Sequence, residues 1–178
     1  MQVATPTKLQ VLDTAGNPVN LGDLAAKRPL VVAFLRHFGC LHCLETVVQL
    51  RGQLGQVKEA GAELILVGNG NPERAATFQS ARAPELRVYT DPTQNSYQAL
   101  NMKHSVASTL GPRSFLSGLL AILRGHRQTS IQGDPWQQGG LFALAKGGRI
   151  VYSQINRHGG DRPDLIAALS SLQSAPNS

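Results

Sequence analysis

The only two cysteines of the chain lie two residues apart, in the segment Cys40-Leu41-His42-Cys43. An apolar run over residues 30–35 precedes them, and a helix-like stretch begins after them at Leu44. A strand that leads into a CxxC at the start of a helix is typical of thiol–disulfide redox proteins. A thiol at that place lies near the positive end of the helix dipole and near unpaired N–H groups, which favour the nucleophilic thiolate. We therefore expect redox chemistry at this pair.

The two cysteines are expected to have different roles. Cys40 is the predicted nucleophile, because the first sulfur of such a pair is the more exposed and the closer to the helix end. Cys43 lies one helical turn later, where it can attack a mixed disulfide or a sulfenic acid on Cys40. Arg36, His37 and His42 flank the pair in the sequence, and cationic neighbours would stabilise the thiolate further.

Other interpretations of these residues compete with redox catalysis. A CxxC can be half of a zinc site, but four ligands are usual and the histidines are scattered: His37, His42, His104, His126 and His158. The cysteines could also be inert, because free cysteine packs as a small hydrophobic residue. Trp136, the only tryptophan, is a candidate wall of the substrate pocket and equally a candidate cap on the core. Gly139 and Gly140 would let backbone approach Cys40.

Composition limits the class of protein. The 178 residues suit one domain over residues 1–178 with a frayed tail from about residue 173, and 42% hydrophobic residues suffice for a core. The net charge is +6, but without a long Lys/Arg run we expect neither nucleic acid nor a membrane as a partner. The first residues lack the apolar stretch of a secretory signal, and the apolar stretch at 115–123 is too short to span a bilayer. A cytoplasmic location is expected.

The elements that must position the cysteines can be inferred from hydrophobic periodicity and turn residues. Strands are predicted over residues 8–12, 30–35, 63–68, 87–90, 141–145 and 150–154, with the last two joined as a hairpin. Helices are predicted over 21–26, from Leu44 after the CxxC to a stop at Gly61, and over 71–83, 91–100, 110–124 and 165–172. Because early strand–helix–strand units give parallel pairs and the late hairpin adds antiparallel strands, the fold class is α/β, with a mixed central sheet and helices on both faces.

Three stretches of the chain carry a resemblance to a known family. They read FLRHFGCLHC at 34–43, YTDP at 89–92, and GDPWQQGG followed by the hairpin and RHGGDRP at 133–163. The chain resembles the peroxiredoxin-like branch of the alkyl-hydroperoxide-reductase/thiol-specific-antioxidant (AhpC/TSA) superfamily, the branch related to selenoprotein U. The resemblance covers nearly the whole chain and implies a three-layer thioredoxin-like fold.

The chain also departs from the pattern of that superfamily. Typical peroxiredoxins have Thr or Ser three residues before the peroxidatic cysteine and Pro seven residues before it, where this chain has His37 and Ala33. Typical members also place Arg just before the late strand, and thioredoxins place a cis-Pro there, whereas this chain has Gln137-Gln138-Gly139-Gly140. The resemblance thus implies redox chemistry more firmly than it implies peroxide as the substrate.

Together these observations predict a thiol-dependent oxidoreductase. Cys40 attacks a hydroperoxide or a disulfide, Cys43 resolves the product to a CxxC disulfide, and an external thiol reductant, a thioredoxin-type protein or glutathione, restores the thiols. No bound cofactor and no metal are required, and the family suggests a possible homodimer. Two alternatives stay open: a redox-sensing or binding module without turnover, acting through the basic segment 124–127, and reduction of an endoperoxide or a quinone-like electrophile.

Overall fold

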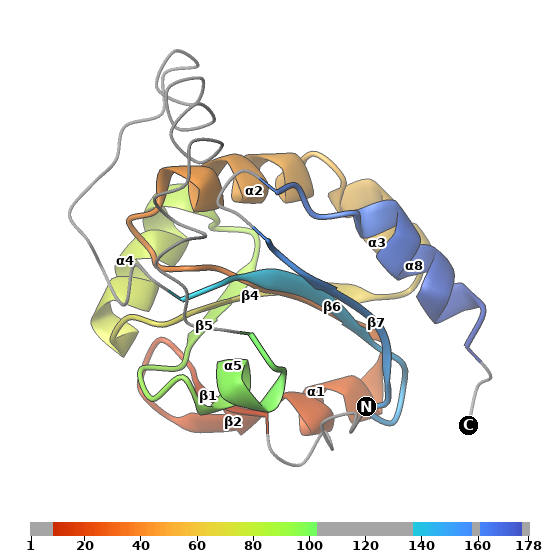
Figure 1. Cartoon of the computed structure of the whole chain (residues 1–178), viewed down its shortest axis with the longest axis horizontal. Coiled ribbons are helices and arrows are strands. Elements are labelled where there is room, and N and C mark those ends of the chain that lie inside the picture. The colour runs from red at the N-terminus through yellow and green to blue at the C-terminus, as the bar shows by residue number, and fades with distance from the viewer. Residues whose placement is uncertain (1–8, 103–136, 158–160, 176–178) are drawn as a thin grey trace.

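The computed structural model describes residues 9–102, 137–157 and 161–175, and within them it confirms an α/β fold around a mixed sheet (Figure 1). The described strands form one seven-stranded sheet with the order β2-β1-β5-β4-β3-β6-β7. The strands are β1 (Gln10–Leu12), β2 (Pro18–Asn20), β3 (Leu30–Phe34), β4 (Glu63–Gly68), β5 (Arg87–Thr90), β6 (Gly140–Leu144) and β7 (Ile150–Ile155). The described helices are α1 (Leu21–Lys27), α2 (Leu41–Arg51), α3 (Leu54–Glu59), α4 (Pro72–Arg82), α5 (Asn95–Ala99) and α8 (Leu165–Gln173).

The centre of the sheet is parallel and its flanks are antiparallel. β3 pairs in parallel with β4, and β4 with β5, whereas β6 runs antiparallel to both β3 and β7. The hairpin of β1 and β2 closes the other edge through an antiparallel contact between Leu12 and Thr90. The carboxyl ends of β3, β4 and β5 therefore meet at one edge of the sheet, which is the usual place for a functional site in such folds.

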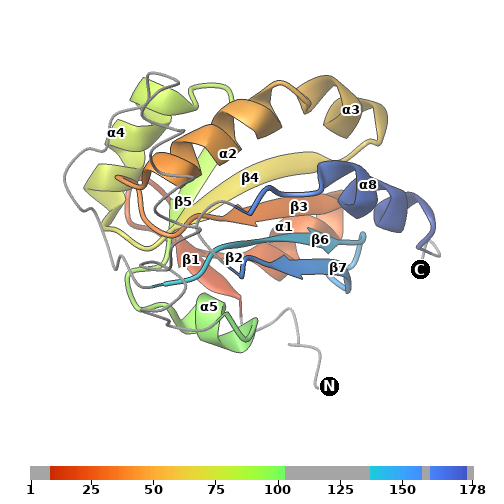
Figure 2. The same cartoon turned by 45° about the horizontal axis from the view of Figure 1, so that its top comes forward.

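Helices cover both faces of this sheet, as the sequence predicts. Figure 1 shows α2, α3, α4 and α8 above the sheet and α1 and α5 below it, and Figure 2 shows the same layers from a view turned by 45°. Side chains of β3 alternate between the two faces: Val31 and Ala33 belong to the core beneath α2, and Val32 and Phe34 belong to the core beside α1 and α5. This period of two is dictated by strand geometry, and burial on both faces explains why β3 is apolar throughout.

One predicted helix is wrong in its extent. The stretch from the CxxC to Gly61 is two helices, α2 and α3, separated at Gly52 and Gln53. Gly52 caps the end of α2, with its N–H donating to the carbonyl groups of Val48 and Leu50. Glycine is unfavourable in the interior of a helix, and Gly52 introduces a break there. The apolar periodicity continues across this break, so it predicted a single helix.

Other helix boundaries agree with their sequence signals. Asn71 accepts a hydrogen bond from the N–H of Arg74 at 2.9 Å, and Pro72 occupies the first position of α4, as predicted. Asp164 similarly caps α8 by accepting from the N–H of Ala167 at 2.9 Å. The predicted helix at 110–124 lies outside the described residues, as does the basic segment 124–127.

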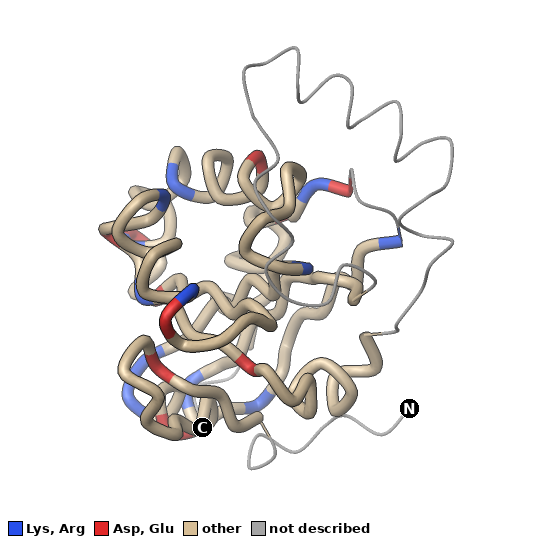
Figure 3. Tube along the Cα trace, turned by 90° about the vertical axis from the view of Figure 1, so that its left-hand side faces the viewer, with Lys and Arg blue, Asp and Glu red and all other residues tan. Residues whose placement is uncertain are grey.

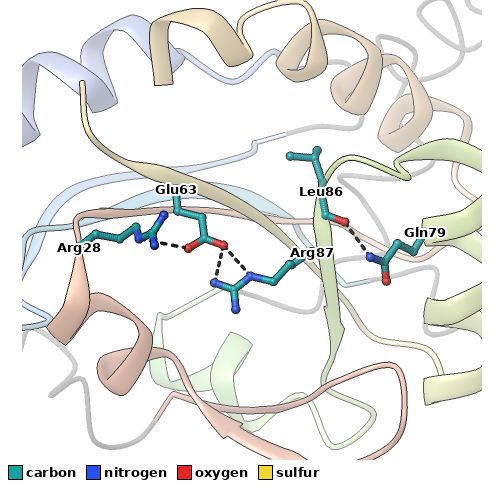
Figure 4. A network of polar contacts seen from close by, with 5 residues as sticks. All are labelled: Arg28, Glu63, Gln79, Leu86 and Arg87. Carbon is teal, nitrogen blue, oxygen red and sulfur yellow. Dashed lines mark hydrogen bonds and ion pairs between the residues drawn. The ribbon is translucent and has the colours of Figure 1, made fainter. Parts of the chain in front are cut away.

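An ion-pair network braces the edge of the sheet opposite to the cysteines (Figure 4). Glu63, the first residue of β4, pairs with Arg87, the first residue of β5, and lies 3.8 Å from Arg28. Gln79 of α4 donates to the carbonyl of Leu86 at 3.0 Å. Because the side chains of Arg28 and Arg87 are 62% and 48% exposed, each ion pair contributes on the order of 1 kcal/mol or less to stability.

Acidic and basic residues are interspersed along the described part of the trace (Figure 3). No helix in this part of the chain is both long enough and apolar enough to cross a bilayer.

Candidate active site

Both cysteines lie where β3 passes into α2. Cys40 is the N-cap residue of α2, with extended backbone angles, and Cys43 lies in the first turn of the helix. Both are free thiols, and only 7% of Cys40 and 4% of Cys43 is exposed. The helix start at Leu41 is thus earlier than the predicted Leu44, and Cys40 is barely more exposed than Cys43.

The two thiols have opposite protonation preferences. A hydrogen bond from the Cys43 side chain, assisted by the Cys43 backbone N–H and the charge of Arg36, lowers the pKa of Cys40 to about 7 against the opposing effect of burial. Burial and the neighbouring Cys40 raise the pKa of Cys43 well above its ordinary value. At neutral pH about half of Cys40 is therefore thiolate while Cys43 keeps its proton, so the two thiols differ in nucleophilic character.

Arg36 links the cysteines to the segment before β6. Its backbone N–H donates to the Sγ of Cys43 at 3.3 Å, and its Nε donates to the carbonyl oxygen of Gln137 at 3.3 Å. Only 6% of Arg36 is exposed, so its guanidinium acts in a medium where a charge is poorly screened. The side chain of Gln137, itself buried, donates to the carbonyl of Met102 at 3.3 Å.

The two histidines predicted at the site are there as well. His37 is buried, and its carbonyl oxygen accepts a hydrogen bond from the N–H of Cys40 at 3.2 Å. His42 is partly buried, with its Nδ1 at 3.8 Å from the Oε2 of Glu45. Arg36, His37 and His42 thus surround the cysteines in space as they do in the sequence. Trp136 lies outside the described residues.

Three residues near the site were not singled out from the sequence. Tyr97 of α5 is fully buried, and its hydroxyl lies 2.7 Å from the carbonyl oxygen of Leu35 and 3.1 Å from that of Val67. Asp91 sets up this helix by accepting from the N–H groups of Thr93 at 3.1 Å and Ser96 at 2.7 Å. The YTDP motif carried a family signal, but only the fold shows that Asp91 positions Tyr97. The third residue is Gln137, whose carbonyl oxygen accepts from Arg36 and whose side chain donates to Met102.

A small pocket of about 20 Å³ opens beside Cys43. Its lining residues come from the end of β3, the start of β6, the residue after β7, the first half of α2 and the segment before α8. Cys40 is not among its lining residues, which are Ala33, Phe34, Leu35, Arg36, His42, Cys43, Thr46, Gly140, Asn156 and Pro163. Within the described ranges, no group of three or more His, Cys, Asp or Glu residues could hold a metal ion.

Gly139 and Gly140 permit close backbone packing, but not against Cys40. A Cβ on Gly139 would lie 2.4 Å from the carbonyl oxygen of Phe34, and one on Gly140 would lie 2.5 Å from that of Gln154. These two glycines therefore fit β6 between β3 and β7, and correct the expectation that they bring backbone to the nucleophile.

Comparison with known proteins identifies the family of this chain. The model of the AhpC/TSA antioxidant enzyme family matches residues 49–158, more than half of the chain. The chain belongs to this family. The matched residues begin after Cys43, so the geometry of the cysteine pair is an observation independent of the match.

Relatives of the AhpC/TSA chain support the same assignment. Thioredoxin-like protein AAED1, chloroplastic, of Arabidopsis thaliana is 32% identical over 166 residues, covering 88% of this chain and 67% of that protein. Peroxiredoxin-like 2C of Bos taurus is 31% identical over 176 residues, covering 93% and 77%. Prostamide/prostaglandin F synthase of Danio rerio is 26% identical over 171 residues, covering 92% and 84%.

Solved structures confirm the thioredoxin-like fold of the AhpC/TSA chain. Peroxidoxin BcpB of Mycobacterium tuberculosis aligns with a TM-score of 0.68 over 99% of both chains, at 13% sequence identity. The bacterioferritin comigratory protein of Xanthomonas campestris, studied for alkyl peroxide reduction, aligns with a TM-score of 0.65 over 95% of this chain and 92% of that one, at 14% identity. At such identities the likeness concerns the fold.

Family and geometry together make this AhpC/TSA chain a peroxidase-like thiol oxidoreductase. The family links it in general terms to peroxide substrates and thiol reductants. The thiols of Cys40 and Cys43 lie close together at the start of α2.

Proposed function

We propose that the chain reduces hydroperoxides with Cys40 as the nucleophile and Cys43 as the resolving residue. The observation that carries this proposal is the hydrogen bond from Cys43 that, with Arg36 nearby, lowers the pKa of Cys40 to about 7, so that a large share of it is thiolate at neutral pH. The thiolate is the form that attacks an O–O bond. An ordinary thiol at its usual pKa would be mostly protonated and slow.

The proposed reaction has two steps before regeneration. The Cys40 thiolate attacks the terminal oxygen of ROOH, the O–O bond breaks, and the alkoxide takes a proton and leaves as ROH, with Cys40 oxidised to a sulfenic acid. The Cys43 sulfur then attacks the Cys40 sulfur, and the hydroxyl leaves as water with the Cys43 proton. The product is the Cys40–Cys43 disulfide, which two equivalents of an external thiol, from a thioredoxin-type protein or glutathione, return to dithiol.

Neighbouring side chains stabilise the thiolate and bind the peroxide in this proposal. Arg36 stabilises the negative charge on Cys40, and its guanidinium is fixed by the carbonyl of Gln137. His37 occupies the place of the missing Thr, and together with His42 it would supply ring N–H groups to a bound peroxide. Trp136, which lies outside the described residues, is proposed to line the place where the peroxide binds.

The decisive experiment is rapid-mixing oxidation of the reduced protein, followed by intrinsic fluorescence and by mass spectrometry. Hydrogen peroxide and an organic hydroperoxide should each be compared in the wild type, Cys40→Ser and Cys43→Ser. We expect fast oxidation that needs Cys40, and accumulation of sulfenic acid on Cys40 in Cys43→Ser. Oxidation of the wild type no faster than that of a free low-molecular-weight thiol would refute the peroxidase proposal.

Redox sensing without turnover is a second candidate function, favoured by one observation. His37 stands where typical peroxiredoxins carry a Thr or Ser, and Gln137-Gln138-Gly139-Gly140 stand in the region where they carry an Arg. In a sensor, the disulfide would change a contact with a partner, and capture of that partner would depend on whether the bait is oxidised. Partner capture that is independent of redox state, together with rapid catalytic turnover, would decide against sensing.

The remaining proposals concern assembly and location. We propose a homodimer, tested by light scattering at several protein concentrations, with a constant monomer mass as the contrary result. We also propose a cytoplasmic location, because a chain with two cysteines in a CxxC suits a reducing compartment. Fractionation of source cells with detection by antibody tests the location, and recovery with organelles, as the name of the Arabidopsis relative suggests for that protein, would contradict it.

A further inference from the structure

The pocket beside the cysteines reaches the resolving residue and not the nucleophile. Cys43 lines it together with Arg36, His42, Thr46 and Asn156, whereas Cys40 does not. We propose that a small anionic thiol of the glutathione type regenerates the enzyme through this pocket, by attacking the Sγ of Cys43 in the Cys40–Cys43 disulfide. This inference rests on the proposed function only in that it requires this disulfide to form.

The lining of the pocket suits a thiolate. The buried Arg36 supplies positive charge, and the side chains of Thr46 and Asn156 supply hydrogen-bonding groups. Residues at the end of β3, Ala33 and Phe34, also line the pocket, and their apolar character suits the methylene next to the sulfur. An excess of positive charge in the whole chain, +6, also favours the approach of a thiol that carries carboxylates.

The size of the pocket limits what can enter. A volume of about 20 Å³ is roughly that of one water site, so it accepts a single sulfur atom and little else. A small thiol can place its sulfur there with its remaining atoms at the opening. A protein dithiol would have to present its cysteine on a protruding loop, so the small size of the pocket favours the small molecule.

The acidity of the two cysteines agrees with attack at Cys43. Thiol–disulfide exchange is faster when the leaving thiol has the lower pKa, and Cys40 is that thiol. In the first exchange RS⁻ forms an S–S bond to Cys43, and the Cys40 thiolate leaves with the electron pair of the old bond. In the second exchange another RS⁻ attacks the sulfur of R, releasing RSSR and a Cys43 thiolate that takes up a proton. Two RSH are oxidised and one protein disulfide is reduced.

The first test locates the mixed disulfide. The unaltered protein is oxidised with diamide, and disulfide formation is verified as the loss of two hydrogens in its mass, so that no peroxidase activity is needed. Limiting glutathione is added, free thiols are trapped with N-ethylmaleimide in acid-quenched aliquots, and peptides are mapped. We expect glutathione on Cys43 and maleimide on Cys40, and the reverse pattern overturns the proposal.

The second test blocks the pocket. Thr46→Leu fills it from α2, whereas Thr77→Leu makes the same substitution at an exposed position of α4. We expect Thr46→Leu to slow reduction of the disulfide by glutathione about tenfold relative to Thr77→Leu, which corresponds to ~1.4 kcal/mol of barrier. Equal rates in the two variants, or faster reduction of the wild type by a thioredoxin-type dithiol protein than by glutathione, overturn the proposal. Peptide mapping of the wild type stays decisive if Thr46→Leu does not fold.

A series of thiols tests the charge preference. Glutathione, neutral 2-mercaptoethanol and cationic cysteamine are compared at equal thiolate concentration and at two salt concentrations. We expect glutathione to be the fastest, with an advantage that shrinks as salt screens the attraction. Cysteamine reacting as fast as glutathione at low salt contradicts the assignment of an anionic thiol. The failure of peroxide turnover affects none of these measurements, since each begins from the chemically formed disulfide.

Discussion

The hydroxyl of Tyr97 lies 2.7 Å from the carbonyl oxygen of Leu35, the residue just before Arg36. Tyr97 belongs to the core beside α1 and α5, so this contact holds the backbone just beyond the carboxyl end of β3 from that face of the sheet. Burial raises the pKa of Tyr97 well above its ordinary value, which keeps the phenol a hydrogen-bond donor at neutral pH. The backbone that leads into the cysteine loop is therefore anchored from below.

Tyr97→Phe is expected to destabilise the fold by about 1–3 kcal/mol, because it removes a buried hydrogen-bond donor from the carbonyl of Leu35. Tyr152→Phe is the matched control, since the hydroxyl of Tyr152 makes a longer 3.3 Å contact with Gln154 in a partly buried place. Urea denaturation of both variants measures the difference. A loss of stability as large in Tyr152→Phe as in Tyr97→Phe would show that the anchor is unimportant.

The pH dependence of Cys40 reactivity should depend on Cys43. The alkylation rate follows the thiolate fraction, so in the wild type it should rise with pH and reach half of its plateau at about pH 7. Cys43→Ala removes the largest cause of the lowered pKa while leaving Cys40 buried, and the midpoint should move to higher pH. Cys43→Ser keeps a donor and should move it less. Iodoacetamide modification between pH 5 and 10, read by mass spectrometry, makes the comparison, and identical midpoints for Ala and Ser would contradict it.

Arg36→Gln should also raise the midpoint of Cys40 alkylation, because it removes a nearby positive charge from a buried site. The shift should be smaller than in Cys43→Ala, since the charge of Arg36 ranks below the hydrogen bond from Cys43 as a cause. Arg36→Lys keeps the charge and should restore part of the effect. If Arg36 only held the loop together, both variants would lower thermal stability and leave the pH profile where it was.

Gly139→Ala is expected to destabilise the protein by about 1–3 kcal/mol, because the added Cβ would lie 2.4 Å from the backbone oxygen of Phe34 and strands cannot yield as a flexible side chain can. Gly55→Ala in α3 is the control. Its Cβ meets nothing within 4 Å, and alanine suits a helix better than glycine, so we expect no loss or a small gain in stability. Thermal unfolding of the two variants separates them, and equal melting temperatures would refute the argument from close packing.

Sequence patterns predicted the fold well wherever local signals were strong. The buried strands β3 and β4, the late hairpin, and the capped starts of α4 and α8 are confirmed because each has its own periodicity or capping residue. The break at Gly52 was missed, because the apolar spacing of the cysteine helix continues into α3. A single glycine inside a periodic stretch does not reveal whether packing will tolerate it.

The site was predictable in its composition and less so in its connections. Cys40, Cys43, Arg36, His37 and His42 are neighbours in the sequence, so one loop was bound to bring them together. The contact of Arg36 with Gln137 joins residues 101 positions apart, and Tyr97 reaches Leu35 across 62 positions. Contacts of that kind depend on strand order, which the local pattern does not contain. The burial of Cys40 likewise depends on the complete fold and not on the local sequence.

The amide of Arg36 donates to the Sγ of Cys43. The strength of this hydrogen bond therefore depends on the chemical state of the sulfur, because a disulfide sulfur accepts a hydrogen bond less well than the sulfur of a thiol. Hydrogen–deuterium exchange at this one backbone position should be slow in the reduced protein and faster after oxidation. Exchange at the Leu35 N–H, which donates to Val67 within the sheet at 2.7 Å, gives an internal reference. One amide would then record the progress of the redox cycle without any label on either cysteine.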